Sequence, residues 1–316
     1  MEQVQNYHPK DFGRVGVFLG GRSHERPISL KSGKAVYQAL KQAGVDVVRI
    51  DTANGFRSKL KQKPIQLAFL ALHGTGGEDG AIQRILNRSR IPYVGSGPKE
   101  SASAFDKAMA KRLFFRFGIP TPRYEVLTRS NWKQKLQKWT PPYVIKPVSE
   151  GSSIGVFFVD HVNNASQKIK SSFKHYSRLL IEEKIEGREF TVGILGARAL
   201  PVIELRPKRT FYDYKAKYTK GLTEYLIPAP IKRDLARRLQ SIALKAHQTI
   251  GLRDLSRVDF KVDSDGNPFV LEINSIPGFT ETSLLPKAAK HIGLEFTDLC
   301  LNLLHMAHGR SNSGNE

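Results

Sequence analysis

The sequence predicts a mixed α/β protein in which a parallel-sheet domain precedes two α+β lobes. Apolar runs of strand length alternate with helical patterns in the first third of the chain, which favours a parallel sheet with crossover helices. Short strands and helices mix through the rest. With 316 residues, 40% of them hydrophobic, the chain is long enough for two or three lobes around one cleft. We expect the domains at residues 1–104, 105–188 and 189–316.

The first domain should contain three strands and a helix between the first two. The run RVGVFL at residues 14–19 has the composition of a buried strand, and further strands are expected at residues 45–50 and 67–72. Residues 29–43 carry apolar side chains at helical spacing, so a helix is expected there. A turn-rich segment, residues 73–80, follows the third strand.

The two later lobes mix helices and strands. A helix expected at residues 106–117 is stopped by Gly118 and Pro120. The other elements expected in the central lobe are strands at residues 143–146, 154–159 and 178–182 and a helix at residues 164–174. The elements expected in the last lobe are strands at residues 189–195 and 199–205, a helix at residues 231–250, a two-stranded unit at residues 255–274 and closing helices.

The two-stranded unit is expected to have one polar and one apolar face. Strand side chains alternate between faces, and DSDGN at residues 263–267 has the composition of a hairpin turn. The residues expected on the apolar face are Val258, Phe260, Val262, Phe269, Leu271 and Ile273. The residues expected on the polar face are Arg257, Asp259, Lys261, Glu272 and Asn274.

Three residues of the polar face, Asp259, Glu272 and Asn274, all offer oxygen. Hard cations such as Mg²⁺ take oxygen ligands and keep phosphate oxygens in their remaining positions. Salt bridges with the basic residues of that face would explain the same alternation equally well. The next segment, SIPGFTETSLLP at residues 275–286, favours a metal site, because a Pro-Gly turn and a helix start can bind an anion through backbone N–H groups. Carboxylates beside an anion site indicate phosphoryl or acyl transfer.

Six motifs resemble those of the D-alanine–D-alanine ligase family, in that family's order and spacing, over residues 14–308. They are GRVGVFLGGRSHERPISLKSG (13–33), ALHGTGGEDG (71–80), KPVSEGSSIG (146–155), TFYDYKAKY (210–218), SRVDF (256–260) and LEINSIPGFTETSLLP (271–286). The resemblance implies the three-lobed ATP-grasp fold, with the N-terminal parallel sheet as its pre-ATP-grasp domain, and a homodimer. Pro27, Ile28 and Phe279 depart from common family residues, and none of these departures removes a proposed catalytic group.

The activity that the resemblance implies is the ATP-dependent ligation of two D-alanines, with release of ADP and phosphate through an acyl phosphate. It would serve peptidoglycan precursor synthesis and hence cell wall biogenesis. ATP is the implied co-substrate. The implied metal is Mg²⁺, two ions held by the hairpin oxygens, with Mn²⁺ as a substitute.

The resemblance also implies a nucleotide site. Lys107 and Lys146 are similar to the family lysines that hold ATP phosphates, and Lys146 precedes a glycine-rich segment suited to phosphates. Taken singly, each would pass for an ordinary surface lysine. The full set implied for ATP is Lys107, Lys146, Ser153, Glu182, Glu183, Lys184, Ile185, Glu189, Lys217 and Phe260. Within it, residues 182–185 would line the adenine pocket and Glu189 would bind the ribose.

The catalytic and substrate-binding residues implied by the resemblance are Glu25, His73, Ser152, Lys217, Tyr218, Arg257, Gly278, Ser283 and Leu284. Glu25 would bind the ammonium of the first D-alanine, and His73 would lie near that substrate. Arg257 and the Gly278 N–H would stabilise the oxyanion of the tetrahedral intermediate. Ser283 and Leu284 would hold the carboxylate of the second D-alanine. Lys217 and Tyr218 would belong to a mobile lid at residues 211–225, with Lys217 at the γ-phosphate.

Two alternatives stay open. A D-alanine–D-lactate ligase is the nearest enzyme, and Tyr218 argues against it, because the resemblance associates tyrosine here with dipeptide enzymes and histidine with many depsipeptide enzymes. A nucleic-acid binder would explain the net charge of +21. The basic residues, however, form no long run and match no nucleic-acid-binding motif, so no nucleic-acid partner is expected.

Composition indicates a cytoplasmic protein. No apolar run approaches the length of a membrane span, and the first residues lack the apolar stretch of a signal peptide. No membrane partner is therefore expected. The single cysteine, Cys300, cannot form an internal disulfide and lies among leucines, so we expect a buried thiol in the core.

Overall fold

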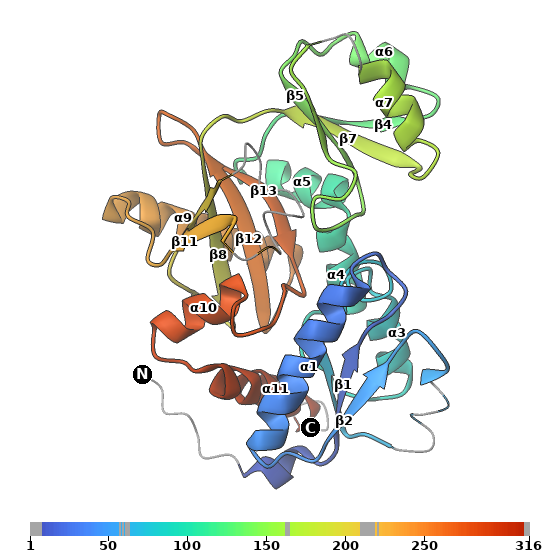
Figure 1. Cartoon of the computed structure of the whole chain (residues 1–316), viewed down its shortest axis with the longest axis vertical. Coiled ribbons are helices and arrows are strands. Elements are labelled where there is room, and N and C mark those ends of the chain that lie inside the picture. Colours follow the sequence, from blue (N-terminus) through green and yellow to red (C-terminus); the bar gives the residue numbers. More distant parts are fainter. Residues whose placement is uncertain are drawn as a thin grey trace.

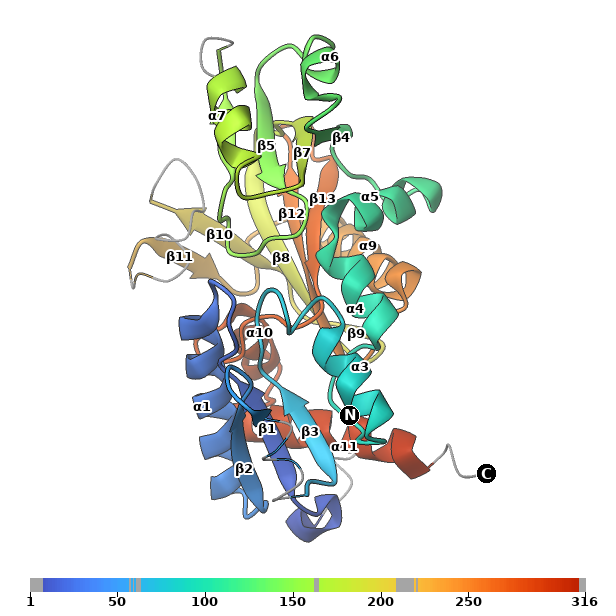
Figure 2. The ribbon, with the colours of Figure 1, turned by 90° about the vertical axis from the view of Figure 1, so that its right-hand side faces the viewer.

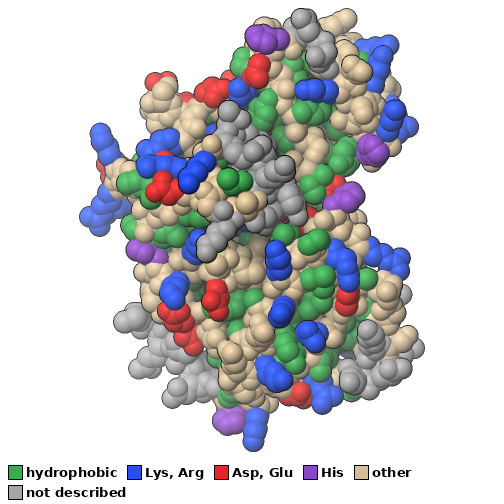
Figure 3. Space-filling model, in the orientation of Figure 1, with side chains coloured by type: hydrophobic (Ala, Val, Ile, Leu, Met, Phe, Trp, Pro, Cys, Tyr) green, Lys and Arg blue, Asp and Glu red, His purple; other side chains and the backbone are tan. Residues whose placement is uncertain are grey.

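The computed structural model describes residues 8–56, 58, 60, 64–161, 165–208, 219 and 221–312 of the chain. Figures 1 and 2 show its three sheets one above another along the longest axis. A parallel sheet lies at one end, a four-stranded antiparallel sheet at the other, and a six-stranded antiparallel sheet between them. None of the described helices combines the length and the apolar composition needed to cross a membrane. Figure 3 shows Lys and Arg side chains spread over the face in view instead of gathered in one patch.

The parallel sheet has the order β2-β1-β3, and its strands β1 and β3 are fully buried. Its elements are η1 (Pro9–Phe12), β1 (Val15–Leu19), α1 (Arg26–Gln42), β2 (Val47–Asp51), β3 (Leu67–Leu70), α3 (Ala81–Arg88) and α4 (Pro98–Phe105). Helix α1 begins before the predicted residue 29. Pro27 explains the difference, because proline fits the first turn of a helix, where its missing N–H needs no partner.

The last helix, α11 (Phe296–Asn312), returns to the parallel sheet and packs against α1. Leu303 and Cys300 are fully buried there, in one core with Val36 and Leu40 of α1. Burial raises the pKa of the Cys300 thiol. The predicted core cysteine is therefore confirmed.

The four-stranded sheet has the order β4-β7-β5-β6. Its elements are β4 (Tyr124–Thr128), α6 (Trp132–Leu136), β5 (Tyr143–Pro147), β6 (Phe157–Val159), α7 (Ala165–Ser172) and β7 (Arg178–Glu183). Strand β6 is shorter than the predicted strand at residues 154–159. Residues 152–155 form a turn instead, and Gly155, inside the predicted strand, has a positive φ angle of 73°, outside the extended region.

The six-stranded sheet has the order β11-β10-β8-β12-β13, with β9 paired to β8. Its strands are β8 (Arg188–Leu195), β9 (Arg198–Ala199), β10 (Ile203–Pro207), β11 (Thr223–Leu226), β12 (Leu255–Val262) and β13 (Pro268–Asn274). The predicted strand at residues 199–205 is divided into β9 and β10, because Pro201 has no N–H for the ladder. The helices beside this sheet are α5 (Lys107–Arg116), α9 (Arg233–Ile250) and α10 (Leu284–His291).

The hairpin of β12 and β13 has the predicted faces on β12. The residues buried in the core are Val258, Phe260 and Val262, and those only partly buried are Arg257, Asp259 and Lys261. On β13 the ladder pairs Asp259 with Glu272 and then Phe260 with Val270, so that Leu271 is an extra residue, a β-bulge.

The bulge makes one prediction about β13 wrong. Phe269 and Leu271 do not share the apolar face with Ile273; Val270 is buried in the core with Ile273 instead. The reason is geometric: an extra residue at position 271 moves the side chains between it and the hairpin turn, residues 268–270, to the opposite face. Leu271 and Glu272 consequently both line a cavity.

Candidate active site

Two cavities adjoin where Gly151 and Glu272 line both of them. Residues of β5, β7, β8, β12 and β13 line the first cavity, which places it between the four-stranded and six-stranded sheets. The second cavity is lined by the start of α1, by β12 and β13, and by residues that follow β3 and β13. The active-site candidates of the sequence thus fall into neighbouring spaces.

The residues predicted for ATP and those predicted for the amino acids separate between these cavities. The first contains Lys107, Lys146, Ser153, Glu182, Glu183, Lys184, Ile185, Glu189 and Phe260, together with Asp259 and Glu272. The second contains Glu25, His73, Ser152, Arg257, Gly278, Ser283 and Leu284, together with Glu272 and Asn274. The remaining two predicted residues, Lys217 and Tyr218, lie outside the described residues.

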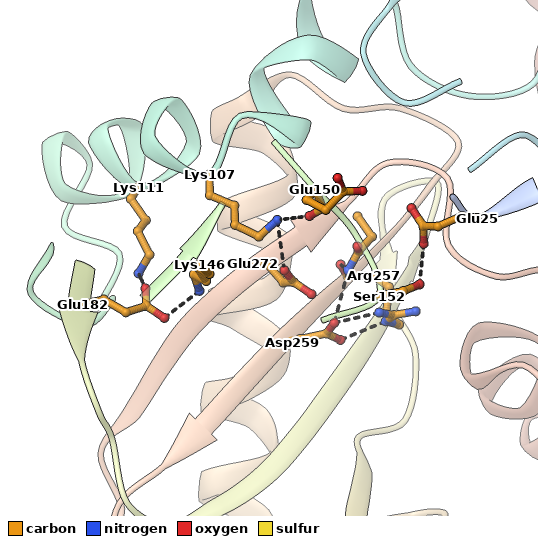
Figure 4. Close-up of polar contacts among 11 residues, drawn as sticks. Glu25, Lys107, Lys111, Lys146, Glu150, Ser152, Glu182, Arg257, Asp259 and Glu272 are labelled. Carbon is orange, nitrogen blue, oxygen red and sulfur yellow. Dashed lines mark hydrogen bonds and ion pairs between the residues drawn. The ribbon is translucent and has the colours of Figure 1, made fainter. Parts of the chain in front are cut away.

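Lysine–carboxylate pairs line the first cavity, and Figure 4 shows their side chains. Lys146 Nζ lies 2.6 Å from Glu182 Oε1, and Lys107 Nζ lies 3.5 Å from Glu272 Oε2. Lys107 also donates to the carbonyl oxygen of Glu150. All these groups are at least three-quarters buried. Cations held this close to an open cavity are suited to bind phosphate.

Another buried lysine, Lys111, contacts Glu182, the partner of Lys146. Its Nζ lies 3.0 Å from Glu182 Oε2. Burial would raise the pKa of Glu182, but the charges of Lys111 and Lys146 outweigh burial and lower it. Burial lowers the pKa of Lys111 to about 8, with Glu182 acting against that shift. The sequence analysis missed Lys111, although its position four residues after Lys107 places both on one face of the predicted helix.

Asp259, which also lines the first cavity, accepts hydrogen bonds from three neighbours. Arg257 donates to both carboxylate oxygens, through Nε at 2.8 Å and Nη2 at 2.7 Å. Thr191 Oγ1 donates at 2.6 Å, and Asn274 Nδ2 donates at 3.1 Å. Asp259 therefore meets Arg257 as a two-point ion pair within the polar face of the hairpin.

The donor set of this face fits a hard divalent cation. Asp259 and Glu272 are direct partners across the ladder, and Arg257 pairs with Asn274 next to them. The two carboxylates supply oxygen ligands, which suit Mg²⁺. Asn274 supplies a third oxygen only if its amide oxygen, in place of its Nδ2, faces the carboxylates. Among the described residues no three His, Cys, Asp or Glu side chains form a metal cluster of their own. A cation here would therefore depend on ligand oxygens as well, as Mg²⁺ beside phosphates does.

Glu25 lies at the boundary of the second cavity, only 5% exposed. Ser152 Oγ donates to its Oε1, whereas Oε2 has no hydrogen-bond partner among the described residues. A Cβ on Gly151 would clash with this carboxylate in its present position, so the missing side chain at residue 151 leaves room for the carboxylate where it now lies. A buried carboxylate with a free oxygen is suited to bind an ammonium group.

His73 is buried in the wall of the second cavity by a chain of hydrogen bonds. Its Nδ1 lies 3.1 Å from the Ile276 carbonyl oxygen, which only a ring N–H can satisfy. Nε2 is then the acceptor and lies 3.1 Å from Ser32 Oγ, which in turn accepts from the Phe279 N–H. Burial lowers the pKa of His73, in agreement with a neutral ring.

Glu78 is a further carboxyl of the second cavity that the sequence analysis missed. It is 8% exposed, and its Oε2 accepts from the Gly74 N–H at 2.8 Å. Burial, followed by the nearby charge of Glu25, raises the pKa of Glu78 to about 8. A turn-rich segment gives no periodicity from which such burial could be predicted; the only signal was its place within a resembling motif.

The far side of the second cavity is formed by the start of α10. Ser283 is the N-cap of that helix, within the segment where a helix start was predicted, and its Oγ accepts from the Thr280 N–H at 3.0 Å. Gly278, Ser283 and Leu284 line the cavity together. A helix start facing a cavity is suited to bind a carboxylate.

Comparisons with known proteins agree with this geometry. Family models described as D-ala D-ala ligase N-terminus and D-ala D-ala ligase C-terminus match residues 51–96 and 113–305. A D-alanine–D-alanine ligase from Methylacidiphilum infernorum is 45% identical over 297 residues, 94% of this chain and 96% of that protein.

Solved structures agree as well. The crystal structure of D-alanine–D-alanine ligase from Bacillus anthracis complexed with ATP has a TM-score of 0.83 at 31% identity, covering 96% of this chain and 99% of that one. A D-Ala:D-Ser ligase from Enterococcus faecalis has a TM-score of 0.80 at 28% identity, covering 93% and 99%. These likenesses confirm the predicted ATP-grasp fold. With both halves of the sequence matched and a 45%-identical relative covering almost its full length, the chain belongs to the D-alanine–D-alanine ligase family.

Proposed function

We propose that this protein joins two D-alanines to D-alanyl-D-alanine, with conversion of ATP to ADP and phosphate through an acyl-phosphate intermediate. One observation carries the proposal: a cavity with buried lysines adjoins a cavity with a buried, half-free carboxylate, and the two meet at Glu272. A γ-phosphate in the first and an amino-acid carboxylate in the second would approach each other there. The ATP complex of the Bacillus anthracis relative supports a nucleotide in the first cavity.

In the first step a carboxylate oxygen of one D-alanine attacks the γ-phosphorus of ATP. The bond from that phosphorus to the bridging oxygen breaks, and ADP leaves with its electron pair. Glu25, oriented by Ser152, would hold the substrate ammonium. Lys107 and Lys146 would neutralise phosphate charge, together with Lys217. Such transfers depend mainly on positioning and electrostatics.

In the second step the free amine of the second D-alanine attacks the carbonyl carbon of the acyl phosphate. The carbon–oxygen bond to phosphate then breaks, phosphate leaves with the electron pair, and the proton that the nitrogen loses passes to the phosphate or to water. Arg257 and the Gly278 N–H would stabilise the oxyanion. Ser283 and Leu284, at the start of α10, would hold the carboxylate of the incoming amino acid.

We propose that Asp259, Glu272 and Asn274 hold Mg²⁺, two ions in all, with Mn²⁺ as a substitute. The metal would neutralise charge on the phosphate oxygens. Because Arg257 occupies both oxygens of Asp259, the arginine has to release at least one of them to a cation. The released guanidinium would then be able to face the reacting carbonyl.

Further proposals rest on the family resemblance. Lys217 and Tyr218 would belong to a lid that excludes water from the acyl phosphate. The protein would act as a homodimer in the cytoplasm and supply peptidoglycan precursors. Size-exclusion chromatography with light scattering measures the oligomeric state. Complementation of a strain lacking the ligase tests the supply of peptidoglycan precursors.

The test of the proposed reaction is phosphate release from ATP with one amino-acid substrate at a time. D-Alanine alone should give phosphate and a dipeptide detected by mass spectrometry, whereas L-alanine should give neither. D-Lactate and D-serine, added beside D-alanine at neutral pH, report on the acceptor; D-serine is included because of the likeness to a D-Ala:D-Ser ligase. Preferred formation of a mixed product would contradict the proposal.

A further inference from the structure

Glu182 lies between two lysines that differ in their surroundings. Its carboxylate is 3% exposed, with Lys146 at 2.6 Å from one oxygen and Lys111 at 3.0 Å from the other. Figure 4 shows the two lysines approaching Glu182 from separate elements, α5 and β5. Two cations thus share one buried anion.

Only one of these lysines borders the first cavity. Lys146 and Glu182 line it, and Lys111 does not. Lys111 is 1% exposed, its Nζ donates to Thr121 Oγ1 at 2.6 Å, and it lies 5.5 Å from the centre of the Tyr124 ring. Lys111 is therefore held away from the cavity by Thr121, Glu182 and the Tyr124 ring, whereas Lys146 can exchange its partner for a ligand in the cavity.

A phosphate in that cavity would draw Lys146 away from Glu182. A buried carboxylate that loses its only counter-charge is strongly destabilised, so a second, permanent cation is needed for the exchange to be favourable. The oxygen that Lys146 leaves can only accept hydrogen bonds. It would suit the amino group of adenine and would repel the carbonyl oxygen that guanine carries at the same position.

We propose that Lys111 is a positioning residue of the nucleotide site, which keeps Glu182 charged and directed into the cavity while Lys146 moves to the phosphates. The inference rests on the proposed function, because it requires a nucleotide in the first cavity. Thr121 also donates to the Val270 carbonyl oxygen at 2.8 Å, next to the bulge before Glu272. Lys111 thus connects the base-binding strand β7 with the strand that carries the proposed metal ligands.

The test compares Lys111→Met with wild type by isothermal titration calorimetry with Mg²⁺ and ATP, and by steady-state kinetics. Without Lys111, Lys146 must either stay paired with Glu182 and not contact the ATP phosphates, or move to the phosphates and leave Glu182 without a counter-charge. The Kd and KM for ATP should rise about tenfold or more, the preference for ATP over GTP should fall, and the KM for D-alanine should stay unchanged. Arg116→Met, an exposed cation on the same helix, is the matched control and should change none of these.

A double-mutant cycle with Glu182→Gln shows whether Lys111 acts through Glu182. In the Glu182→Gln background, Lys111→Met should not weaken ATP binding further, because the carboxylate that Lys111 serves is gone. An equal loss in both backgrounds, or no loss in either, would overturn the inference. If Lys111→Met does not fold, Thr121→Val removes the hydroxyl that holds Lys111, and an unchanged Kd for ATP in that variant would overturn it.

The wild-type titration separates this inference from the proposed function. Wild-type protein that does not bind ATP would overturn both. Wild-type binding and turnover, together with an unaffected Lys111→Met variant, would overturn the role of Lys111 alone.

Discussion

Replacing Glu78 by glutamine should stabilise the protein at alkaline pH. The Glu78 carboxyl has a pKa of about 8 in the folded chain, against an ordinary value of 4.5. Burial is the main cause, and the charge of Glu25 adds to it; the Gly74 N–H, Lys107 and Arg257 oppose it, in that order. The substitution keeps the shape of the side chain and an oxygen for the Gly74 N–H.

The sign of the change in stability follows from the pH range in which Glu78 is protonated in the folded chain. Because folding raises its pKa, the protonated Glu78 contributes its full stability below about pH 4.5 and loses it as the pH rises towards 8. Above pH 8 the wild type therefore carries an ionised carboxyl in a buried place. At about 1.4 kcal/mol for each pKa unit, Glu78→Gln should gain roughly 3 to 5 kcal/mol over wild type at pH 9, and little at pH 5.

Chemical denaturation of both proteins between pH 5 and 9 measures this difference. The free energy of unfolding of wild type minus that of Glu78→Gln isolates the contribution of one carboxyl, because all other groups titrate in both proteins. Glu224→Gln, at an exposed carboxyl of β11, is the control for the same substitution at the surface. A Glu78→Gln difference that is flat across this range would refute the burial argument.

Three other substitutions test separate parts of the molecule. Glu272→Gln should keep the fold, seen by circular dichroism, yet lose Mg²⁺-dependent phosphate release by at least about tenfold; wild-type turnover would remove Glu272 from the metal site. Ser152→Ala should raise the KM for D-alanine about tenfold with little change in the KM for ATP, because Glu25 loses the hydroxyl that orients it; equal changes in both would contradict this role. Arg310→Met should cost about 3 kcal/mol in denaturant unfolding, because it removes the ion pair of the buried Asp254; an unchanged midpoint would contradict it.

Local patterns in the sequence predicted the parts of the fold that local physics determines. The helix expected at residues 106–117 is α5, with Asp106 as its N-cap accepting from the Met109 N–H. The alternation along residues 255–262 predicted which side chains of β12 enter the core. In both cases the repeat of the backbone places side chains on one face, so composition along a short window is enough.

Contacts between distant segments could not be predicted in this way. Arg310 of α11 lies against Asp254, which also accepts from the Gly95 N–H at 2.7 Å. These three positions belong to segments far apart in the sequence, and no spacing relates them. The same holds for Glu78 and Glu25, whose mutual effect on pKa depends on how the turn after β3 packs against α1. The resemblance to a family supplied candidate roles there, but not the charges that surround each group.

The β13 strand shows how a single extra residue decides which side chains reach a site. PFVLEIN has apolar residues at both parities, so strict alternation cannot bury Val270 and Ile273 together while Glu272 and Asn274 stay on the cavity face. A bulge at Leu271 allows both of these arrangements at once. It also leaves Leu271 itself facing the first cavity beside Glu272. The cavity thereby gains an apolar wall on the same strand that carries carboxylate and amide oxygens. A ligand with a flat apolar ring at one end and phosphates at the other could contact both surfaces on β13. With strict alternation, Leu271 and Glu272 would lie on opposite faces of the strand, and only one of them could line the cavity.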